Sequence, residues 1–195
     1  MSRGNHDLVA IGASWGGLDV LRTILGALPA ELDAAIVVAQ HRAADSMPNG
    51  LRNLLGAATR LRVVEASDKD KLEPGTVYVA APDYHLLVDG VSLALSTDEP
   101  VQYARPSIDV LLESAAESHR ERCVAVVLTG ANADGSHGLA RVRELGGVAI
   151  VQDPATAARA EMPRAALAAV PDAVVGAPAA IAELVTELCG VQVVA

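Results

Sequence analysis

Short apolar runs alternate with amphipathic stretches along most of the chain. The runs are typical of strands covered on both faces, and the stretches between them have the spacing of helices with one apolar side. Strands are predicted at residues 8–11, 34–40, 61–65, 76–80, 123–128, 148–151 and 173–175, and helices at 18–28, 51–55, 108–118, 136–145, 164–170 and 178–188. Repeated strand–helix–strand units predict an α/β fold, with a doubly wound, mostly parallel sheet flanked by helices.

One segment interrupts this alternation. Residues 84–88 have the pattern of a strand, Asp89-Gly90 follows, and apolar side chains then alternate at Val91, Leu93 and Leu95. An Asp-Gly pair between alternating apolar positions is a strong signal for a two-residue hairpin. We therefore expect an antiparallel β-hairpin inserted into the parallel architecture.

Composition limits the classes of partner. The 195 residues fit one domain, and we expect it to span residues 1–195. The formal net charge of −9 argues against a nucleic-acid partner and against an anionic membrane surface, because both need a basic footprint. No apolar stretch is long enough for membrane insertion or typical of a signal peptide, so a cytoplasmic location is expected. Cys123 and Cys189 are expected to be buried free thiols.

Three chemically active side chains follow predicted strands. Ser14 follows the first strand, His41 the second, and Asp134 lies in the loop after the strand at 123–128. Ligands of open parallel sheets bind outside the carboxyl ends of the strands, so these three side chains are expected at one edge. A hydroxyl, an imidazole and a carboxylate are the components of a Ser-His-Asp triad.

The glycine-rich turn around Ser14 is compatible with other functions as well. Such a turn can cradle a phosphate, hold a dinucleotide or expose a nucleophile. Gly12, Gly16 and Gly17 depart from the G-x-G-x-x-G spacing, and no lysine follows them as in a phosphate-binding P-loop. Residues 12–16 also satisfy the G-x-S-x-G pattern of α/β-hydrolases, but in that fold the acid precedes the histidine, which is the reverse of the order here.

Each of the three residues also has an ordinary structural interpretation. Ser14 could cap the following helix, His41 could be a hydrogen-bonded loop residue, and Asp134-Gly135 has turn and helix-capping chemistry. Two rival histidines lie nearby in the pattern, His137 in a first helical turn and His85 in the hairpin, whereas His6 and His119 are predicted at solvated positions. No histidine spacing indicates a metal site.

Several motifs together resemble the catalytic domain of the CheB-type protein-glutamate methylesterases of bacterial chemotaxis. They are Ile11-Gly12-Ala13-Ser14-x-Gly16-Gly17, Gln40-His41, Leu72-x-Pro74-Gly75-x-Val77-Tyr78-x-Ala80, Arg105-Pro106-Ser107-Ile108-Asp109-Val110-Leu111, Leu128-Thr129-Gly130 with Asp134-Gly135, and Met162-Pro163-Arg164. The matching motifs span nearly the whole chain, and their joint occurrence is specific.

This resemblance implies an enzyme with Ser14 as nucleophile, His41 as base and Asp134 as the orienting acid. The implied reaction is hydrolysis of glutamate γ-methyl esters on the cytoplasmic helices of chemoreceptors or similar methylated proteins, with release of methanol. Some members of the family also deamidate glutamine. No cofactor is implied.

Further residues are expected to surround the triad. The oxyanion is expected to meet backbone N–H groups near Trp15 and Gly16, with help from the loop of Gly130, Ala131 and Asn132. Ser107 is a good N-cap for the helix at 108–118. Arg105, in the loop before that helix, is expected either to contact the substrate or to form an ion pair that holds its loop.

The chain departs from the family pattern at four positions and in its domain content. Ala131 and Asn132 replace the frequent Met and Gly, Trp15 replaces a commonly smaller residue, and Arg42 replaces Met. These changes leave the triad intact and affect the expected substrate preference. A stand-alone form without the family's phospho-receiver domain is expected. Two other classes stay open, a catalytically inactive α/β interaction module and a nucleotide-binding protein.

Overall fold

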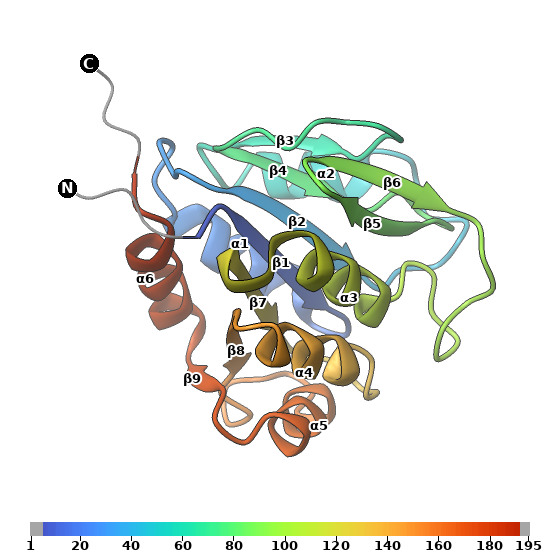
Figure 1. Cartoon of the computed structure of the whole chain (residues 1–195). Coiled ribbons are helices and arrows are strands. Elements are labelled where there is room, and N and C mark those ends of the chain that lie inside the picture. Colours follow the sequence, from blue (N-terminus) through green and yellow to red (C-terminus); the bar gives the residue numbers. More distant parts are fainter. Residues whose placement is uncertain (1–5, 192–195) are drawn as a thin grey trace.

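The computed structural model describes residues 6–191, which form a central parallel sheet covered by helices on both faces (Figure 1). The strand order is β3-β4-β2-β1-β7-β8-β9, and every neighbouring pair is parallel. The strands are β1 (Leu8–Ala13), β2 (Ala35–Gln40), β3 (Arg62–Glu65), β4 (Thr76–Val79), β7 (Cys123–Val127), β8 (Val148–Gln152) and β9 (Val174–Gly176). The expected doubly wound α/β fold is confirmed. The ends of the predicted domain, residues 1–5 and 192–195, lie outside the described residues.

The alternation of side chains along β1 explains why the sheet is covered twice. Leu8 and Ala10 belong to one apolar cluster, whereas Val9 and Ile11 belong to the other. The first cluster is completed by α3 (Ile108–His119), α4 (Ser136–Glu144) and α5 (Glu161–Ala169), and the second by α1 (Gly17–Ala27), α2 (Gly50–Gly56) and α6 (Pro178–Cys189). Both faces of the strand are apolar because both are buried.

The antiparallel insert is a separate two-stranded sheet of β5 (His85–Asp89) and β6 (Ser92–Ser96). Asp89 pairs with Ser92, so the two loop residues are Gly90 and Val91, and Val91 lies in the turn rather than in the predicted strand. Gly90 has φ of +60°, a conformation that glycine adopts without strain. Leu86, Val88 and Leu93 bury the hairpin against the α3 side of the core.

One helix begins earlier than the sequence suggests. The sequence pattern predicts a start at Arg164, directly after Met162-Pro163, but α5 begins at Glu161. Pro163 is the third residue of the helix, where a backbone N–H has no partner within the helix to lose. The first turn of a helix therefore accommodates the proline.

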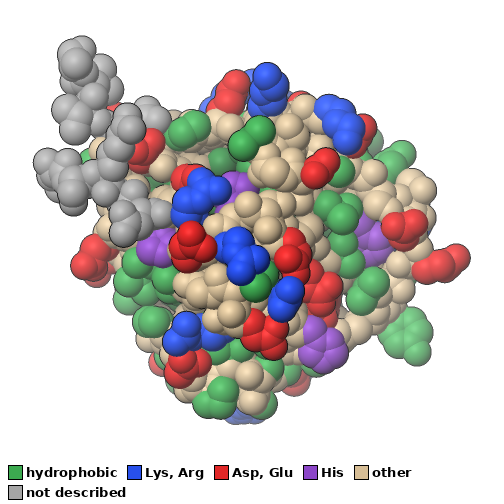
Figure 2. Space-filling view, viewed as in Figure 1, with side chains coloured by type: hydrophobic (Ala, Val, Ile, Leu, Met, Phe, Trp, Pro, Cys, Tyr) green, Lys and Arg blue, Asp and Glu red, His purple; other side chains and the backbone are tan. Residues whose placement is uncertain are grey.

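Charged side chains are interspersed on the face that α3 and α4 form (Figure 2). Arg141 of α4 illustrates this pattern, because it pairs with Glu117 across the two helices and with Glu144 one turn further along. Within the part of the chain that the structure describes, no helix combines the length and the apolar character needed to cross a bilayer. Cys123 and Cys189 are buried free thiols, as predicted, and burial raises the pKa of each to about 12.

Candidate active site

The three predicted strand-end residues meet at one edge of the sheet. Ser14 directly follows β1, His41 directly follows β2, and Asp134 lies in the loop between β7 and α4. Strand β1 lies between β2 and β7, so the chain leaves the three adjacent strands at the same edge. The order of strands reverses here, which is where open α/β sheets form ligand sites.

A continuous chain of hydrogen bonds links the three side chains. His41 Nδ1 lies 3.1 Å from Ser14 Oγ, and His41 Nε2 lies 2.7 Å from Asp134 Oδ2. The Asp134 side chain is fully buried, whereas 14% of the His41 side chain is exposed. Solvent and a ligand can therefore reach the Ser14 end of this series of hydrogen bonds, while the Asp134 end is shielded from solvent.

The Asp134 carboxylate lies at the N-terminus of α3. Its Oδ2 accepts the Ile108 N–H at 2.7 Å, and its Oδ1 accepts the Asp109 N–H and the Ser107 hydroxyl, each at 2.9 Å. Burial alone would raise the pKa of Asp134, but the hydrogen bonds from His41 and from the two backbone N–H groups outweigh it, so that its pKa lies below the ordinary value. Asp134 is therefore a carboxylate at neutral pH.

The ionised state of Asp134 determines the tautomer of His41. A carboxylate can only accept hydrogen bonds, so the proton between the two residues is on His41 Nε2. In a neutral imidazole the other nitrogen, Nδ1, then carries a lone pair, and this nitrogen faces the Ser14 hydroxyl. The arrangement can accept the serine proton when Ser14 attacks an electrophile.

Backbone contacts fix the turn that carries Ser14. The Ser14 N–H donates to the Thr129 carbonyl at 2.9 Å, and the Gln40 side chain donates to the Ser14 carbonyl at 2.8 Å. Gly16 has φ of +77°, and a Cβ there would lie 2.6 Å from Ala158 Cβ. Glycine is therefore required at this position for both conformation and space.

The predicted oxyanion candidates differ in the availability of their N–H groups. Among residues 6–191, the N–H groups of Trp15 and Gly16 meet no internal acceptor, and the same holds for those of Ala131 and Asn132. The Gly130 N–H, in contrast, donates to the Arg159 carbonyl at 3.1 Å. The expectation that Gly130 helps as an oxyanion donor is corrected, because its donor is already engaged; it forms a wall instead, and a Cβ there would lie 2.9 Å from Ser14 Cβ.

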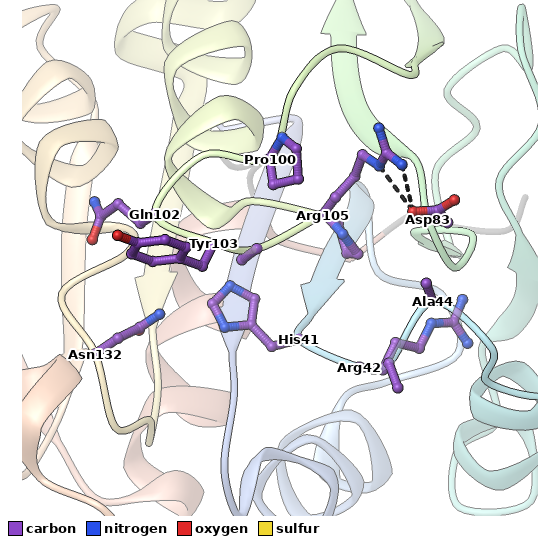
Figure 3. Close-up of a pocket in the computed structure, with 12 residues that line it drawn as sticks. His41, Arg42, Ala44, Asp83, Pro100, Gln102, Tyr103, Arg105 and Asn132 are labelled. Carbon is purple, nitrogen blue, oxygen red and sulfur yellow. Dashed lines mark hydrogen bonds and ion pairs between the residues drawn. The ribbon is translucent and has the colours of Figure 1, made fainter.

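A pocket of about 590 Å³ begins at His41 and extends toward the loop before α3 (Figure 3). Arg105 lines it, but its guanidinium is held by Asp83 at 2.6 Å and by the Thr97 and Asp98 carbonyls at 2.9 and 3.0 Å. Of the two roles considered for Arg105, these contacts are those of the loop-holding ion pair; a contact with substrate stays a prediction. Arg42 also lines the pocket and bonds Glu65 and the Ala80 carbonyl.

The other histidines have different partners. His85 is buried, accepts the Ser107 N–H and bonds the Glu99 carbonyl, so it does not compete with His41. His119, predicted at a solvated position, is buried 3.8 Å from Asp7, and burial lowers its pKa. The described residues contain no cluster of three or more His, Cys, Asp or Glu that could hold a metal ion.

Two residues of the site were not identified from the sequence as functional. Ser107 was predicted as a helix cap, and it does accept the Val110 N–H, but its hydroxyl also donates to Asp134. Gln40 links the ends of β1 and β2 by donating to the carbonyls of Ser14 and His41. A polar side chain at the end of an otherwise apolar strand was the available signal for Gln40.

Gly12 is packed closely against Ile108, and Ile108 in turn contacts Asp134. A Cβ at residue 12 would overlap the buried side chain of Ile108, whose N–H bonds Asp134. We expect Gly12→Ala to lower the free energy of unfolding by about 1 to 3 kcal/mol, as overpacking does, and to reduce activity by moving the start of α3. Urea denaturation measures the first effect, and an assay of the ester hydrolysis expected from the sequence measures the second. Gly56→Ala is the control, because a Cβ there would lie 3.8 Å from its nearest neighbour, Val63 Cβ, which is an ordinary contact distance. An equal loss in both variants would contradict the packing argument.

Comparison with known proteins identifies the family of this chain. The family model described as CheB methylesterase matches residues 9–185. A protein of Leptospira interrogans named putative protein-glutamate methylesterase/protein-glutamine glutaminase is 43% identical over 166 residues, which cover 85% of this chain and 86% of that protein. Protein-glutamate methylesterase FrzG of Myxococcus xanthus is 42% identical over 163 residues, which cover 83% of this chain and 48% of FrzG.

A solved structure extends the likeness to three dimensions. The crystal structure of the Thermotoga maritima CheB methylesterase catalytic domain superposes with a TM-score of 0.88 at 32% identity, covering 94% of this chain and 98% of that one. The family model, the relatives and the solved structure therefore agree, and the chain belongs to the CheB methylesterase family.

Proposed function

We propose that this protein is a serine hydrolase that demethylates glutamate γ-methyl esters on proteins and deamidates glutamine side chains, with Ser14, His41 and Asp134 as its catalytic triad. The hydrogen-bonded chain from Ser14 through His41 to buried Asp134 is the observation that carries this proposal. The names of the relatives, methylesterase and glutaminase, support both activities.

The reaction proceeds in two half-reactions through an acyl-enzyme. Ser14 Oγ attacks the ester carbonyl while His41 Nδ1 takes its proton, and Asp134 stabilises the imidazolium that forms. His41 then returns the proton to the departing oxygen, the C–O bond breaks, and methanol leaves an acyl-Ser14. Water attacks in the same way and releases the glutamate carboxylate and Ser14. With glutamine the C–N bond breaks and ammonia leaves.

Backbone N–H groups stabilise the negative oxygen of each tetrahedral intermediate. Those of Trp15 and Gly16 are the donors that we assign, because they follow the nucleophile directly and have no acceptor of their own among the described residues. They also lie at the start of α1, where the helix dipole favours negative charge. Loss of one such donor typically costs about 3 to 4 kcal/mol of transition-state stabilisation.

Methylated chemoreceptors or similar proteins are the substrates that we propose, because the family resemblance points to glutamate esters on helical signalling domains. Their helical segments lie in the cytoplasm, and we propose the same location for this enzyme. The ester must enter at Ser14, where the exposed edge of His41 borders the pocket toward the α3 loop.

Two measurements test the proposal. A fluorophosphonate probe reacts only with an activated serine, so labelling at Ser14 is expected, identified by peptide mass spectrometry. Methanol release from a methylated chemoreceptor cytoplasmic fragment is expected in parallel. Absence of both would identify an inactive interaction module, and thermal stabilisation by ATP or NAD in their place would favour a nucleotide-binding protein.

A further inference from the structure

Tyr103 is fully exposed at the mouth of the pocket that begins at His41. Its ring and the Asn132 amide lie on one side of His41, and Arg42 and Arg105 lie on the other (Figure 3). An exposed ring buries no apolar area, so Tyr103 contributes nothing to the core. A role in folding therefore does not explain this side chain.

The backbone that presents Tyr103 is unfavourable for its residues. Val101 and Ala104 close a turn with two backbone hydrogen bonds of 3.1 and 2.9 Å, and the central residues Gln102 and Tyr103 have φ of +48° and +63°. Positive φ at both central positions is the type I′ pattern, in which asparagine and glycine are preferred. Residues held in such conformations concentrate at ligand-binding and active sites.

Buried and charged groups hold this turn in place. The Gln102 amide donates to Asp109 Oδ2 at 2.9 Å, and Asp109 is a buried residue in the first turn of α3. On the other side, Arg105 is fixed by Asp83 and by two backbone carbonyls. The turn is therefore tied to the same helix whose N-terminus holds Asp134, which gives Tyr103 a defined position relative to the triad.

The pocket offers more space than an ester group fills. Its volume of about 590 Å³ is in the range of sites for drug-sized ligands, whereas the reacting group is one side-chain ester. Of the three triad residues, His41 alone is in the lining, so the pocket extends away from the reacting bond. When an ester is at Ser14, the polypeptide beside it is what can occupy this space.

We infer that Tyr103 is a specificity-determining residue, which binds the polypeptide flanking the reactive glutamate through its aromatic ring and so favours protein substrates over small esters. This inference rests on the proposed function. Tyrosine suits the role because it offers a large apolar contact with few rotatable bonds, and tyrosine is enriched among residues that dominate protein interfaces. Tyr103 is fully exposed, so the whole face of its ring is available for this contact.

Steady-state kinetics with two substrates test this inference. For Tyr103→Ala we expect kcat/KM on a methylated chemoreceptor fragment to fall about tenfold, mainly through KM, as loss of one interface anchor does. The effect should be confined to the protein substrate: hydrolysis of p-nitrophenyl acetate and the rate of fluorophosphonate labelling report the triad separately. Tyr103→Phe is expected to restore kcat/KM, because it keeps the ring.

Val91→Ala is the matched control. Val91 is 72% exposed in the hairpin turn, near the C-terminal end of α3, and its truncation should change neither substrate's kinetics. Unchanged KM for the protein in Tyr103→Ala overturns the inference, and so does an equal loss on both substrates, which would mean that the turn positions the triad. If the wild-type protein hydrolyses neither substrate, the proposed function itself fails; if it hydrolyses both and Tyr103→Ala matches it, the inference alone fails.

Discussion

Replacing Ser14 by alanine is expected to abolish methanol release from a methylated receptor fragment, with kcat reduced by about 10⁶-fold, the size of loss seen when a triad nucleophile is removed. The reason is that, among residues 6–191, Ser14 supplies the hydroxyl at His41 Nδ1, so no acyl-enzyme can form without it. The fold should be unaffected, because Ser14 is fixed through its backbone N–H and carbonyl, which alanine retains. Methanol release and fluorophosphonate labelling measure the loss, and urea denaturation measures the fold.

Ser92→Ala serves as the control for this variant. It removes a serine hydroxyl from the first residue of β6, which is paired with Asp89 next to the hairpin turn. Its kinetics should match those of the wild-type protein. Retained esterase activity in Ser14→Ala, with normal unfolding, would show that another residue is the nucleophile and would reject the triad proposed here.

The general arrangement of the sheet followed from local pattern. Strand β1 is apolar at every position because both of its faces are covered, and this is visible in the sequence as a continuous apolar run. Parallel strands need crossover helices, so the carboxyl ends of β1, β2 and β7 had to lie at one edge. For this reason the sequence alone was sufficient to bring Ser14, His41 and Asp134 together in the prediction.

The partners within that edge could not be predicted in the same way. Asp134 was predicted as the partner of His41, but its other three donors come from residues 107–109, which only tertiary packing brings beside it. Likewise, the engagement of the Gly130 N–H depends on Arg159, and the burial of His119 depends on α3 packing beside Asp7. Contacts between distant segments leave no periodicity in a single sequence.

Asp134→Asn is expected to leave the fold intact and to reduce kcat by about 10⁴-fold, as the equivalent change does in other Ser-His-Asp triads. Each carboxylate oxygen of Asp134 accepts two hydrogen bonds, so the new NH₂ group must face donors whichever way the amide turns. At the Oδ2 position it would face His41 and hold the tautomer with a proton on Nδ1, which cannot accept from Ser14. In either orientation one backbone N–H loses its acceptor, that of Ile108 at Oδ2 or that of Asp109 at Oδ1, at a cost of about 1 to 3 kcal/mol in stability. Kinetics on the methylated fragment and urea denaturation measure the two losses.

The pH dependence of the unfolding free energy distinguishes the contribution of the Asp134 charge from that of the size of its side chain. Because its pKa is depressed in the folded state, the carboxylate stabilises the protein above its unfolded pKa of about 4, and this stabilisation is lost as pH falls through the folded value. The difference in unfolding free energy between wild type and Asp134→Asn should therefore shrink below about pH 4.

Asp109→Asn is the control for the loss of kcat in Asp134→Asn. Asp109 is also buried, but burial raises its pKa, and it bonds Gln102 and Gly138 rather than His41. A 10⁴-fold loss of kcat in this control as well would show that the charge near α3, and not the bond to His41, is what catalysis requires.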